Sequence, residues 1–455
     1  MGARDTIAAI ATAVGGGVGI VRVSGPHARA VAEQLCHPWP ASFHPHHLYF
    51  VSIGKEKSQD RVVDPIDKGL FCFMESPHSY TGEDVLEVHA HGGRVVLEQI
   101  LQAVLAEGVR LAQPGEFTKR AFLAGKMDLT QAEAVAAVVG ASSERAARQA
   151  QRQLGGELRR LLSGFRAELV RLLGLVEGTL DFPDADEDIH VQRDVVEAVT
   201  GLERRLGSLR DGFEQGGKAL HKGLQVVLVG KTNAGKSSLL NALAGSERVL
   251  VDAAPGTTRD VVEVPLRVGD VDVVLIDTAG ERVDATWLEQ QGLRLGKMWT
   301  RQADVVLLVV DGTEGMDHTT HALLHELRQA QVPLCIVWNK MDQQGFVAPP
   351  AQDVPVVACS ALCGWGLDQL KQEMLAPFSK GLQEDILLTT ARQAAGLDCA
   401  LQALQQAREG LLAAQPMDLV ASALRQAVFH LEEVTGEQVT EGVLDALFAQ
   451  FCIGK

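Results

Sequence analysis

The residue types best suited to chemistry stand in one glycine-rich segment, residues 230–237, which reads GKTNAGKS. Its glycines let backbone N–H groups curl around phosphate oxygens, and a following helix adds the partial positive charge of its N-terminus. Lys236 is expected to reach the β- and γ-phosphates, and the Ser237 hydroxyl is expected to bind Mg²⁺. An apolar run at 225–229 predicts a strand before the segment, and 236–244 predicts a helix after it, which is the context of a P-loop. The segment therefore predicts a nucleoside triphosphate site.

Two further segments, each after an apolar run, indicate that the base is guanine. Residues 339–342 read NKMD, and the carboxylate of Asp342 can accept hydrogen bonds from both N1–H and the 2-amino group of guanine. Adenine offers no such pair, so a kinase or ATPase is disfavoured. Residues 360–362 read SAL and would place a backbone N–H against guanine O6.

The metal and the γ-phosphate have candidate partners between these segments. Residues 277–280 read DTAG, which places Asp277 beside the Mg²⁺ shell and the Gly280 N–H near the γ-phosphate. Thr258, in the segment GTTRD, would complete the Mg²⁺ coordination begun by Ser237. This order of motifs resembles the translation-factor-related class of GTPases. The GTP-binding residues expected from the motifs are Asn233, Ala234, Gly235, Lys236, Ser237, Ser238, Gly256, Thr257, Thr258, Asp277, Thr278, Ala279, Gly280, Asn339, Lys340, Asp342, Ser360, Ala361 and Leu362.

The elements that must position these residues alternate in type. Val/Leu/Ile-rich runs with helical segments between them predict a mostly parallel sheet covered on both faces. Such a sheet binds its ligand at the carboxyl ends of its strands. The predicted strands are 225–229, 271–276, 304–310, 333–338 and 354–358, and the predicted helices are 236–244, 287–298, 319–331 and 367–374.

The flanking segments have other patterns. Up to about residue 114, strand-like runs such as 19–23 and 85–89 and a helix at 95–105 predict an α+β domain. Helical stripes follow: one runs from Leu154 through Leu158, Leu161, Phe165, Leu169 and Leu172 to Val176 and is broken at 181–184, and a second begins at Val195. The pattern from 383 to 449 is again helical. We therefore expect a multidomain α/β protein whose helical domain is split by an inserted P-loop GTPase domain. Its boundaries are 1–116, 117–220, 221–379 and 380–455.

Composition narrows the class further. The chain has 455 residues and a net charge of 42 − 58 = −16, which argues against a surface made as a whole for nucleic acid. Seven scattered cysteines fit reduced thiols in the cytoplasm, and the pattern shows no signal peptide or membrane span. Neither the pair Cys359 and Cys363 nor the histidines at 44, 46 and 47 have the spacing of a metal site.

Several segments outside the GTPase motifs resemble the MnmE (TrmE) family of tRNA modification GTPases. The resemblance runs the full length of the chain and includes its last residues, FCIGK. The matching segments are DTIAA at 5–9, GIVRVSG at 19–25, SYTGED at 79–84, HGG at 91–93, PGEFT at 114–118, RAFL at 120–123 with Lys126 and 128–129, DFP at 181–183 and FCIGK at 451–455.

The resemblance implies that the N-terminal domain is folate-binding-like, binds a tetrahydrofolate derivative (5,10-methylene- or 5-formyl-) and forms a homodimer. Arg22, Glu87, Lys126 and Lys455 match the folate-contacting positions of the family. The two basic side chains would suit the anionic glutamate tail, and Glu87 would suit a pterin-like donor edge. Whether Cys452 has a chemical role stays open.

It also implies a GTPase activated by K⁺. Asn233, Asp252, Ala254 and Thr257 match the potassium ligands, and the enclosing loop adds Asp252, Ala253, Ala254 and Pro255 to the GTP-binding set, which already holds Gly256. K⁺ could offset phosphate charge in the transition state as an arginine finger does. Glu289 matches the glutamate that orients the attacking water, so the expected catalytic residues are Glu289, Lys236 and Asn233.

The implied function is modification of the wobble uridine of tRNA at C5. A one-carbon unit from folate would form a carboxymethylaminomethyl or aminomethyl group, with a flavin- and NADH-dependent partner, MnmG, in a heterotetramer. A GTPase assembly or regulatory factor is the alternative, and 5-formyltetrahydrofolate binding would separate the two. Contact of this acidic chain with tRNA must be local. Arg145, Arg148, Arg152 and Arg159, with Arg160 beside them, form either a phosphate-contacting stripe or a solvated helix face.

Overall fold

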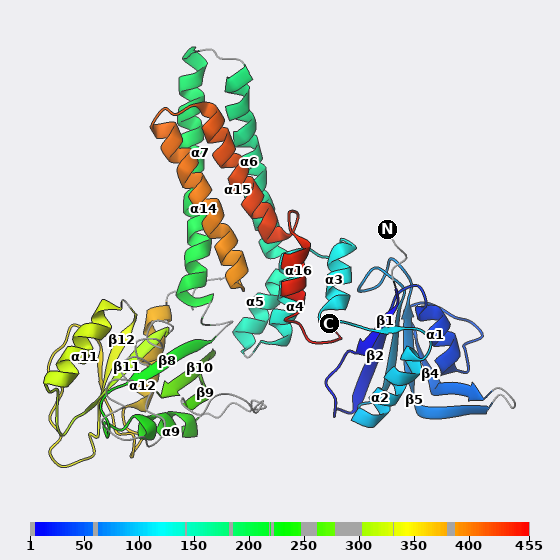
Figure 1. The fold of residues 1–455 in the computed structure, drawn as a ribbon, viewed down its shortest axis with the longest axis horizontal. Helices are drawn as coiled ribbons and strands as arrows, with labels where there is room; N and C mark the ends of the chain where they lie inside the picture. Colours follow the sequence, from blue (N-terminus) through cyan, green and yellow to red (C-terminus); the bar gives the residue numbers. More distant parts are fainter. Residues whose placement is uncertain are drawn as a thin grey trace. The chain divides into compact units, whose positions relative to one another are not determined.

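The protein is described here by a computed structural model, shown as a ribbon in Figure 1. The residues that the structure describes are 5–57, 62–141, 143–181, 185–217, 219, 223–246, 262–277, 303–330, 332–379 and 387–454. The chain divides into two compact units. The first joins residues 1–136 to 431–455, and the second comprises residues 137–430.

The first unit is built on a mixed sheet with the strand order β3-β4-β5-β6-β2-β1-β7. All its described pairings are antiparallel except that of β1 with β7. Its strands are β1 (Ile7–Ile10), β2 (Val18–Ser24), β3 (Cys36–His37), β4 (Leu48–Lys57), β5 (Val62–Met74), β6 (Val85–His91) and β7 (Arg110–Leu111).

Helices α1 (Ala28–Leu35) and α2 (Arg94–Leu105) cover one face of this sheet, because their apolar side chains share one core with those of the strands. Helix α3 (Glu116–Leu123) follows β7. The C-terminal segment also belongs to this unit: Leu444 and Phe448 of α16 (Glu441–Phe448) pack with Leu129 and Ala132 of α4 (Leu129–Val139).

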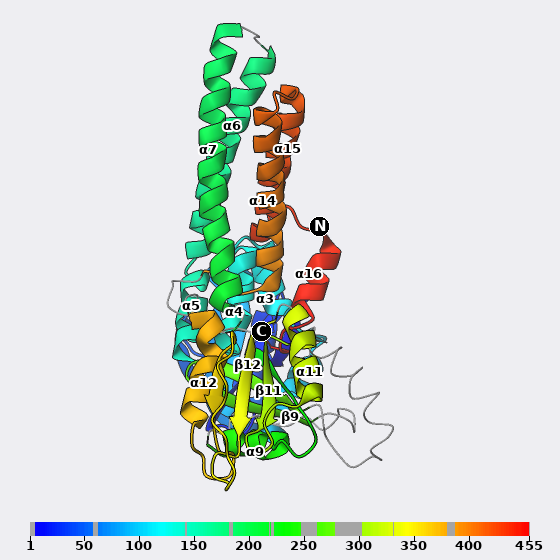
Figure 2. The ribbon, with the colours of Figure 1, turned by 90° about the vertical axis from the view of Figure 1, so that its left-hand side faces the viewer.

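The second unit contains long helices from both sides of an α/β segment, and Figures 1 and 2 show α6 and α7 side by side. The ion pairs Arg210–Asp398 and Arg408–Glu203 join α7 to α14, so helices from before and after the α/β segment pack together. These helices are α5 (Glu144–Leu154), α6 (Glu157–Asp181), α7 (Ala185–Gly212) with a π-turn at Phe213–Gly217, α14 (Ala391–Leu412) and α15 (Met417–Thr435). None of the helices among the described residues is long and apolar enough to cross a membrane.

The first predicted helical stripe is wrong at its beginning. Leu154 ends α5 and is 36% exposed, and the chain turns at Gly155 and Gly156, where φ of Gly156 is +78°. The buried stripe of α6 therefore starts at Leu158, and Leu162 rather than Leu161 lies in it. The same turn moves Arg159 and Arg160 onto a different helix from Arg145, Arg148 and Arg152.

The α/β segment has the strand order β13-β12-β11-β8-β10-β9. Every pairing is parallel except β9 with β10, and the sequence pattern did not predict β9. Its strands are β8 (Leu224–Val229), β9 (Val262–Val268), β10 (Val271–Asp277), β11 (Val305–Asp311), β12 (Leu334–Asn339) and β13 (Val356–Ala358).

Helices cover both faces of this sheet. Helices α9 (Lys236–Ser246) and α12 (Leu367–Leu375) share a core with one face, and α11 (His318–Gln329) shares a core with the other. The predicted multidomain α/β class with an inserted α/β segment is confirmed by this architecture. The predicted helix at 287–298 lies outside the described residues.

Candidate functional site

The glycine-rich segment leaves β8 at the carboxyl edge of the sheet and enters α9. Three of its residues have positive φ: Gly230 (+147°), Asn233 (+66°) and Gly235 (+95°). A Cβ on Gly230 would lie 2.3 Å from the Val309 carbonyl oxygen, so a side chain is excluded there. This is the curled backbone of a phosphate cradle at a helix N-terminus.

Lys236 lies inside this loop and is only 6% exposed. Its Nζ donates hydrogen bonds to the backbone oxygens of Gly230 (2.8 Å) and Lys231 (2.7 Å). Burial lowers the pKa of the Lys236 ammonium, and the charge of Asp277 opposes that effect. The ammonium is thus a buried cation held by neutral carbonyls, an arrangement that favours an anionic ligand.

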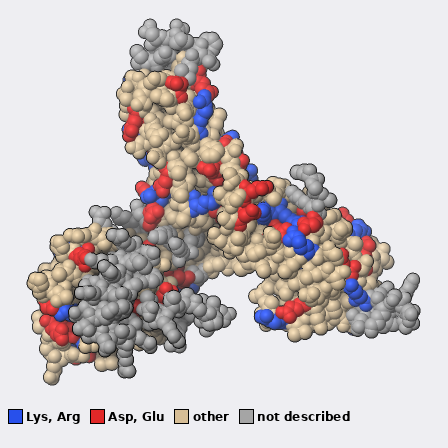
Figure 3. All heavy atoms as spheres, in the orientation of Figure 1, with Lys and Arg blue, Asp and Glu red and all other residues tan. Residues whose placement is uncertain are grey.

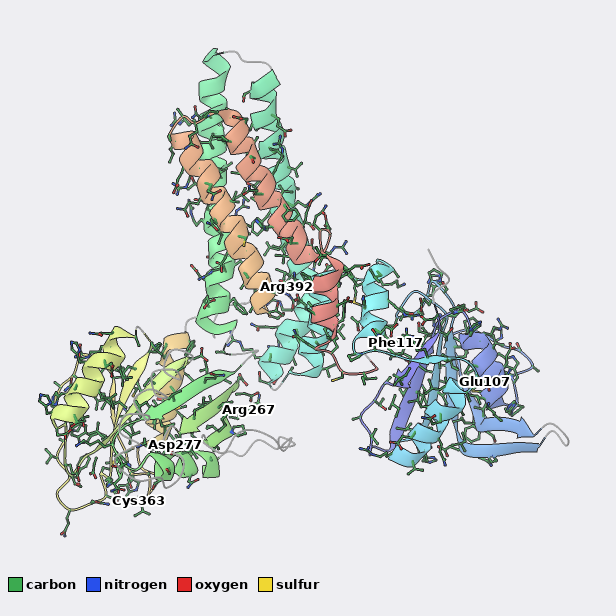
Figure 4. All side chains as sticks on the ribbon, viewed as in Figure 1. Glu107, Phe117, Arg267, Asp277, Cys363 and Arg392 are labelled. Atoms are coloured by element: carbon green, nitrogen blue, oxygen red, sulfur yellow. The ribbon has the colours of Figure 1, made fainter. Side chains whose placement is uncertain are left out.

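Ser237 and Asp277 come together as a Mg²⁺ site requires. Ser237 Oγ donates a hydrogen bond of 2.8 Å to Asp277 Oδ2, and Asp277, labelled in Figure 4, ends β10 at the same edge of the sheet. A hydroxyl and a carboxylate oxygen are donors that Mg²⁺ prefers, so these residues fit the ion.

The side chain of Asn339 ties the glycine-rich loop to residues 360–362, which are expected to contact the base. Its Nδ2 donates to the Ala234 carbonyl oxygen at 3.0 Å, and its Oδ1 accepts from the Ala361 N–H at 3.1 Å. Asn339 is 2% exposed, and a Cβ on Gly235 would lie 2.2 Å from its Nδ2. Sequence reasoning placed Asn339 in the site but did not predict this tie.

The predicted guanine-reading groups are neighbours. Ser360, fully buried, donates from Oγ to Asp342 Oδ1 at 2.6 Å and accepts from the Cys363 N–H at 3.0 Å. Lys340 has φ of +67° and forms an ion pair of 2.5 Å with Asp311 at the end of β11, a partner that the motifs did not indicate. Leu362 is 84% exposed.

Several expected residues lie outside the described part of the chain. They are Asp252, Ala253, Ala254, Pro255, Gly256, Thr257, Thr258, Thr278, Ala279, Gly280, Glu289 and Lys455. Among the residues that are described, no three His, Cys, Asp or Glu side chains are grouped to hold a metal ion.

In the first unit, Arg22 and Glu87 form a pair across β2 and β6. Arg22 Nε lies 2.9 Å from Glu87 Oε1, and its guanidinium lies over the rings of Tyr80 (5.5 Å) and Phe117 (5.6 Å). His89 Nε2 lies 3.3 Å from Glu87 Oε2. The hydrogen bond from His89 lowers the pKa of Glu87, and Arg22 lowers it further, while burial opposes both.

The structure does not record a direct contact of Lys126 with this pair. Lys126 Nζ donates to the Pro77 carbonyl oxygen at 2.8 Å, in the segment that also carries Tyr80. Sequence reasoning missed Tyr80 and His89. The alternation of β6 could have indicated His89, because residues two apart on a strand share a face.

Two family models match the chain. The model described as the GTP-binding protein TrmE N-terminus matches residues 6–126, and the model described as the MnmE helical domain matches residues 129–452. The tRNA modification GTPase MnmE of Geotalea uraniireducens is 39% identical, with 99% of each chain covered. That of Thiobacillus denitrificans is 41% identical, with 99% of this chain and 98% of that protein covered.

Among solved structures, a variant of Aquifex aeolicus Era bound to GDP and AlF4⁻ is 27% identical, with 40% of this chain and 67% of that chain covered and a TM-score of 0.28. The family models and the full-length relatives agree, and together with the P-loop site they show that the chain belongs to the MnmE (TrmE) family of tRNA modification GTPases.

Proposed function

We propose that this GTP hydrolase is activated by K⁺ and acts, as a homodimer with the flavin- and NADH-dependent protein MnmG, in modification of the wobble uridine of tRNA. Its task would be to add a carboxymethylaminomethyl or aminomethyl group at C5 with a one-carbon unit from tetrahydrofolate. This modification would take place in the cytoplasm, and tRNA would be the substrate. The observation that best supports the GTP part is the tie that Asn339 makes between the phosphate loop and the Asp342–Ser360 pair.

Three described residues, Lys236, Ser237 and Asp277, have roles toward the phosphates and the metal in this proposal. Lys236 would exchange its two carbonyl partners for β- and γ-phosphate oxygens. Ser237 would bind Mg²⁺ directly together with Thr258, and Asp277 would accept from a water of the metal shell. Bound Mg²⁺ and K⁺ would supply positive charge against the phosphate oxygens.

The potassium ligands of the proposal are Asn233, Asp252, Ala254 and Thr257, of which only Asn233 is described. Asn233 is exposed and has a positive φ. Glu289 would orient the attacking water. A comparison of GTP turnover in K⁺ and in Na⁺, for the wild type and for Asn233→Ala, tests whether potassium activates hydrolysis. Equal turnover in the two ions would refute potassium activation.

The folate proposal assigns Arg22 and Lys126 to the carboxylates of the glutamate tail and Glu87 to the donor edge of the pterin, with Lys455 nearby. Arg22 is held by Glu87 and lies beside two rings, so its guanidinium has a fixed orientation for a carboxylate. It follows that the first unit, 1–136 with 431–455, contains the described candidate residues. The finer division at 116, 220 and 379 stays part of this proposal.

Titration of the protein with 5-formyltetrahydrofolate tests this assignment. We expect binding that Arg22→Gln weakens at least tenfold and that Arg29→Gln leaves unchanged, because Arg29 is a half-exposed arginine of the same unit, paired with Glu33. Folded wild-type protein that hydrolyses GTP but does not bind folate would favour a GTPase assembly or regulatory factor instead.

A further inference from the structure

One side of α5 carries three arginines. Ala146, Ala150 and Gln153 of this helix are buried, whereas Arg145, Arg148 and Arg152 are half-buried or exposed. At 3.6 residues per turn, the three arginines lie within about 60° of one another around the helix axis and span about 10 Å along it. We call Arg145, Arg148 and Arg152 the arginine face.

The turn after α5 adds further positive charge. Arg152 donates two hydrogen bonds, of 2.7 Å and 2.6 Å, to the carboxylate of Glu157, the first residue of α6. Arg160 Nε lies 3.4 Å from the Gly156 carbonyl oxygen, and its charge also acts on Glu157. One carboxylate at this corner therefore faces two guanidinium groups.

The segment that carries the arginine face and the start of α6 is positive in an acidic chain. Residues 144–160 contain five arginines and two glutamates, a local net charge of +3 in a protein of net charge −16. The pair Arg148–Glu144 is exposed on both sides, with 71% and 85% of the side chains accessible, so it contributes little to stability. A phosphate can replace such a carboxylate, because guanidinium binds both with the same two-pronged geometry.

The surroundings of the arginine face determine what kind of anion fits it. Residues 129–164 contain no Phe, Tyr or Trp, so this segment has no aromatic ring to stack on a base. The arginines lie in a row along the helix and do not converge on one point, which suits a chain of phosphates better than one small anion. Contacts of this kind position a nucleic acid without reading its sequence.

We propose that the arginine face, with Arg160 at the corner, binds the phosphate backbone of the RNA substrate. This inference rests on the proposed function in tRNA modification and names the surface that would make the contact. On the face of the protein seen in Figure 3, Lys and Arg lie interspersed with Asp and Glu. A local patch is therefore the form that RNA contact would take in this chain.

The test is tRNA affinity of the full-length protein as a function of salt. Each phosphate contact adds about 0.7 to 0.9 to the slope of log K against log salt. Arg145→Gln with Arg148→Gln and Arg152→Gln should reduce that slope by about 2.1 to 2.7. The ratio of variant to wild-type Kd should therefore change by about 20- to 40-fold between 50 and 200 mM salt.

A matched control removes the same charge elsewhere. Arg204→Gln with Arg205→Gln and Arg425→Gln changes three arginines of α7 and α15, of which Arg205 and Arg425 are paired with Glu168 and Glu177. This control should keep the wild-type slope. Conversely, Glu144→Gln should tighten tRNA binding, because it releases Arg148. If the Arg148–Glu144 pair were only structural, Glu144→Gln would not tighten tRNA binding.

The outcomes separate this inference from the proposed function. An unchanged slope in the triple Gln variant, with wild-type protein that does bind tRNA, overturns the arginine face alone. Wild-type protein that hydrolyses GTP and does not bind tRNA overturns the tRNA part of the proposed function. Equal loss in the variant and the control shows a net-charge effect and also overturns the arginine face.

Discussion

The proposed recognition of the guanine 2-amino group by Asp342 can be measured as a coupling energy. Ser360 Oγ holds Asp342 Oδ1 at 2.6 Å and is itself held by the Cys363 N–H, so the carboxylate is oriented before the base arrives. A carboxylate has about four acceptor positions, and Ser360 uses one of them. A hydrogen bond to such a charged acceptor is worth about 1.5 to 3 kcal/mol.

Inosine nucleotides lack the 2-amino group, so wild-type protein should bind GDP roughly 10- to 150-fold more tightly than IDP. In Asp342→Ala the two affinities should become equal, which closes a double-mutant cycle on this one contact. Ser360→Ala should remove only part of the discrimination, because the carboxylate stays but loses its orientation.

The assay is titration calorimetry with GDP and IDP at saturating Mg²⁺, which avoids turnover. Asp353→Ala is the control, because Asp353 is an exposed aspartate, 71% accessible, in the same α/β segment. This variant should keep the wild-type ratio. A GDP-to-IDP ratio that survives in Asp342→Ala would refute the reasoning, because another group must then read the amino group.

Three shorter predictions concern single residues of the two units. Gly235→Ala should weaken GDP binding at least tenfold, because the new Cβ would lie 2.2 Å from Asn339 Nδ2 and the residue has a φ of +95°. Gly245→Ala in α9 is the control and should leave GDP binding unchanged, because a Cβ on Gly245 meets open space. Arg120→Met should cost about 1.5 to 3 kcal/mol in urea unfolding of the first unit, because Arg120 is 7% exposed and its removal takes one guanidinium from Glu83 and Glu116, of which Glu116 keeps Arg110. Arg110 and then Arg120 lower the pKa of the Asp5 carboxyl. The contribution of Asp5 to the free energy of unfolding is therefore present above about pH 4 and should be lost as the pH falls below that value, which acid unfolding followed by circular dichroism can check. An Asp5→Asn variant with the same acid midpoint as wild type would contradict this.

The sequence predicted the strand ends of the nucleotide site well, because each motif is short, contiguous and anchored to a buried strand. Lys236, Asp277 and Asp342 all come after such runs, and the topology of a parallel sheet brings them to one edge. Contacts between segments distant in the sequence were not predicted. The tie from Asn339 to Ala234 spans 105 residues, and no local pattern encodes it.

Two local errors have physical causes. Strand β9 was missed because Pro265 stands in its middle, and a proline within a run argues against a strand except at a sheet edge, where β9 lies. The α5–α6 turn was missed because the leucine period continues across Gly155 and Gly156. Periodicity alone does not register a pair of glycines that ends one helix and starts another.

The packing of the last helix into the first unit bears on the order in which the chain folds during synthesis. Leu129 packs against Leu444 and Phe448, which leave the ribosome about 300 residues after it. At 5 to 20 residues per second, that interval lasts roughly 15 to 60 s. Throughout it the early sheet can form around its own core, while the apolar side of α4 stays exposed. A nascent chain that stalls before α16 therefore exposes the apolar side of α4 to chaperones and proteases, and synthesis of α16 completes the core around Leu129.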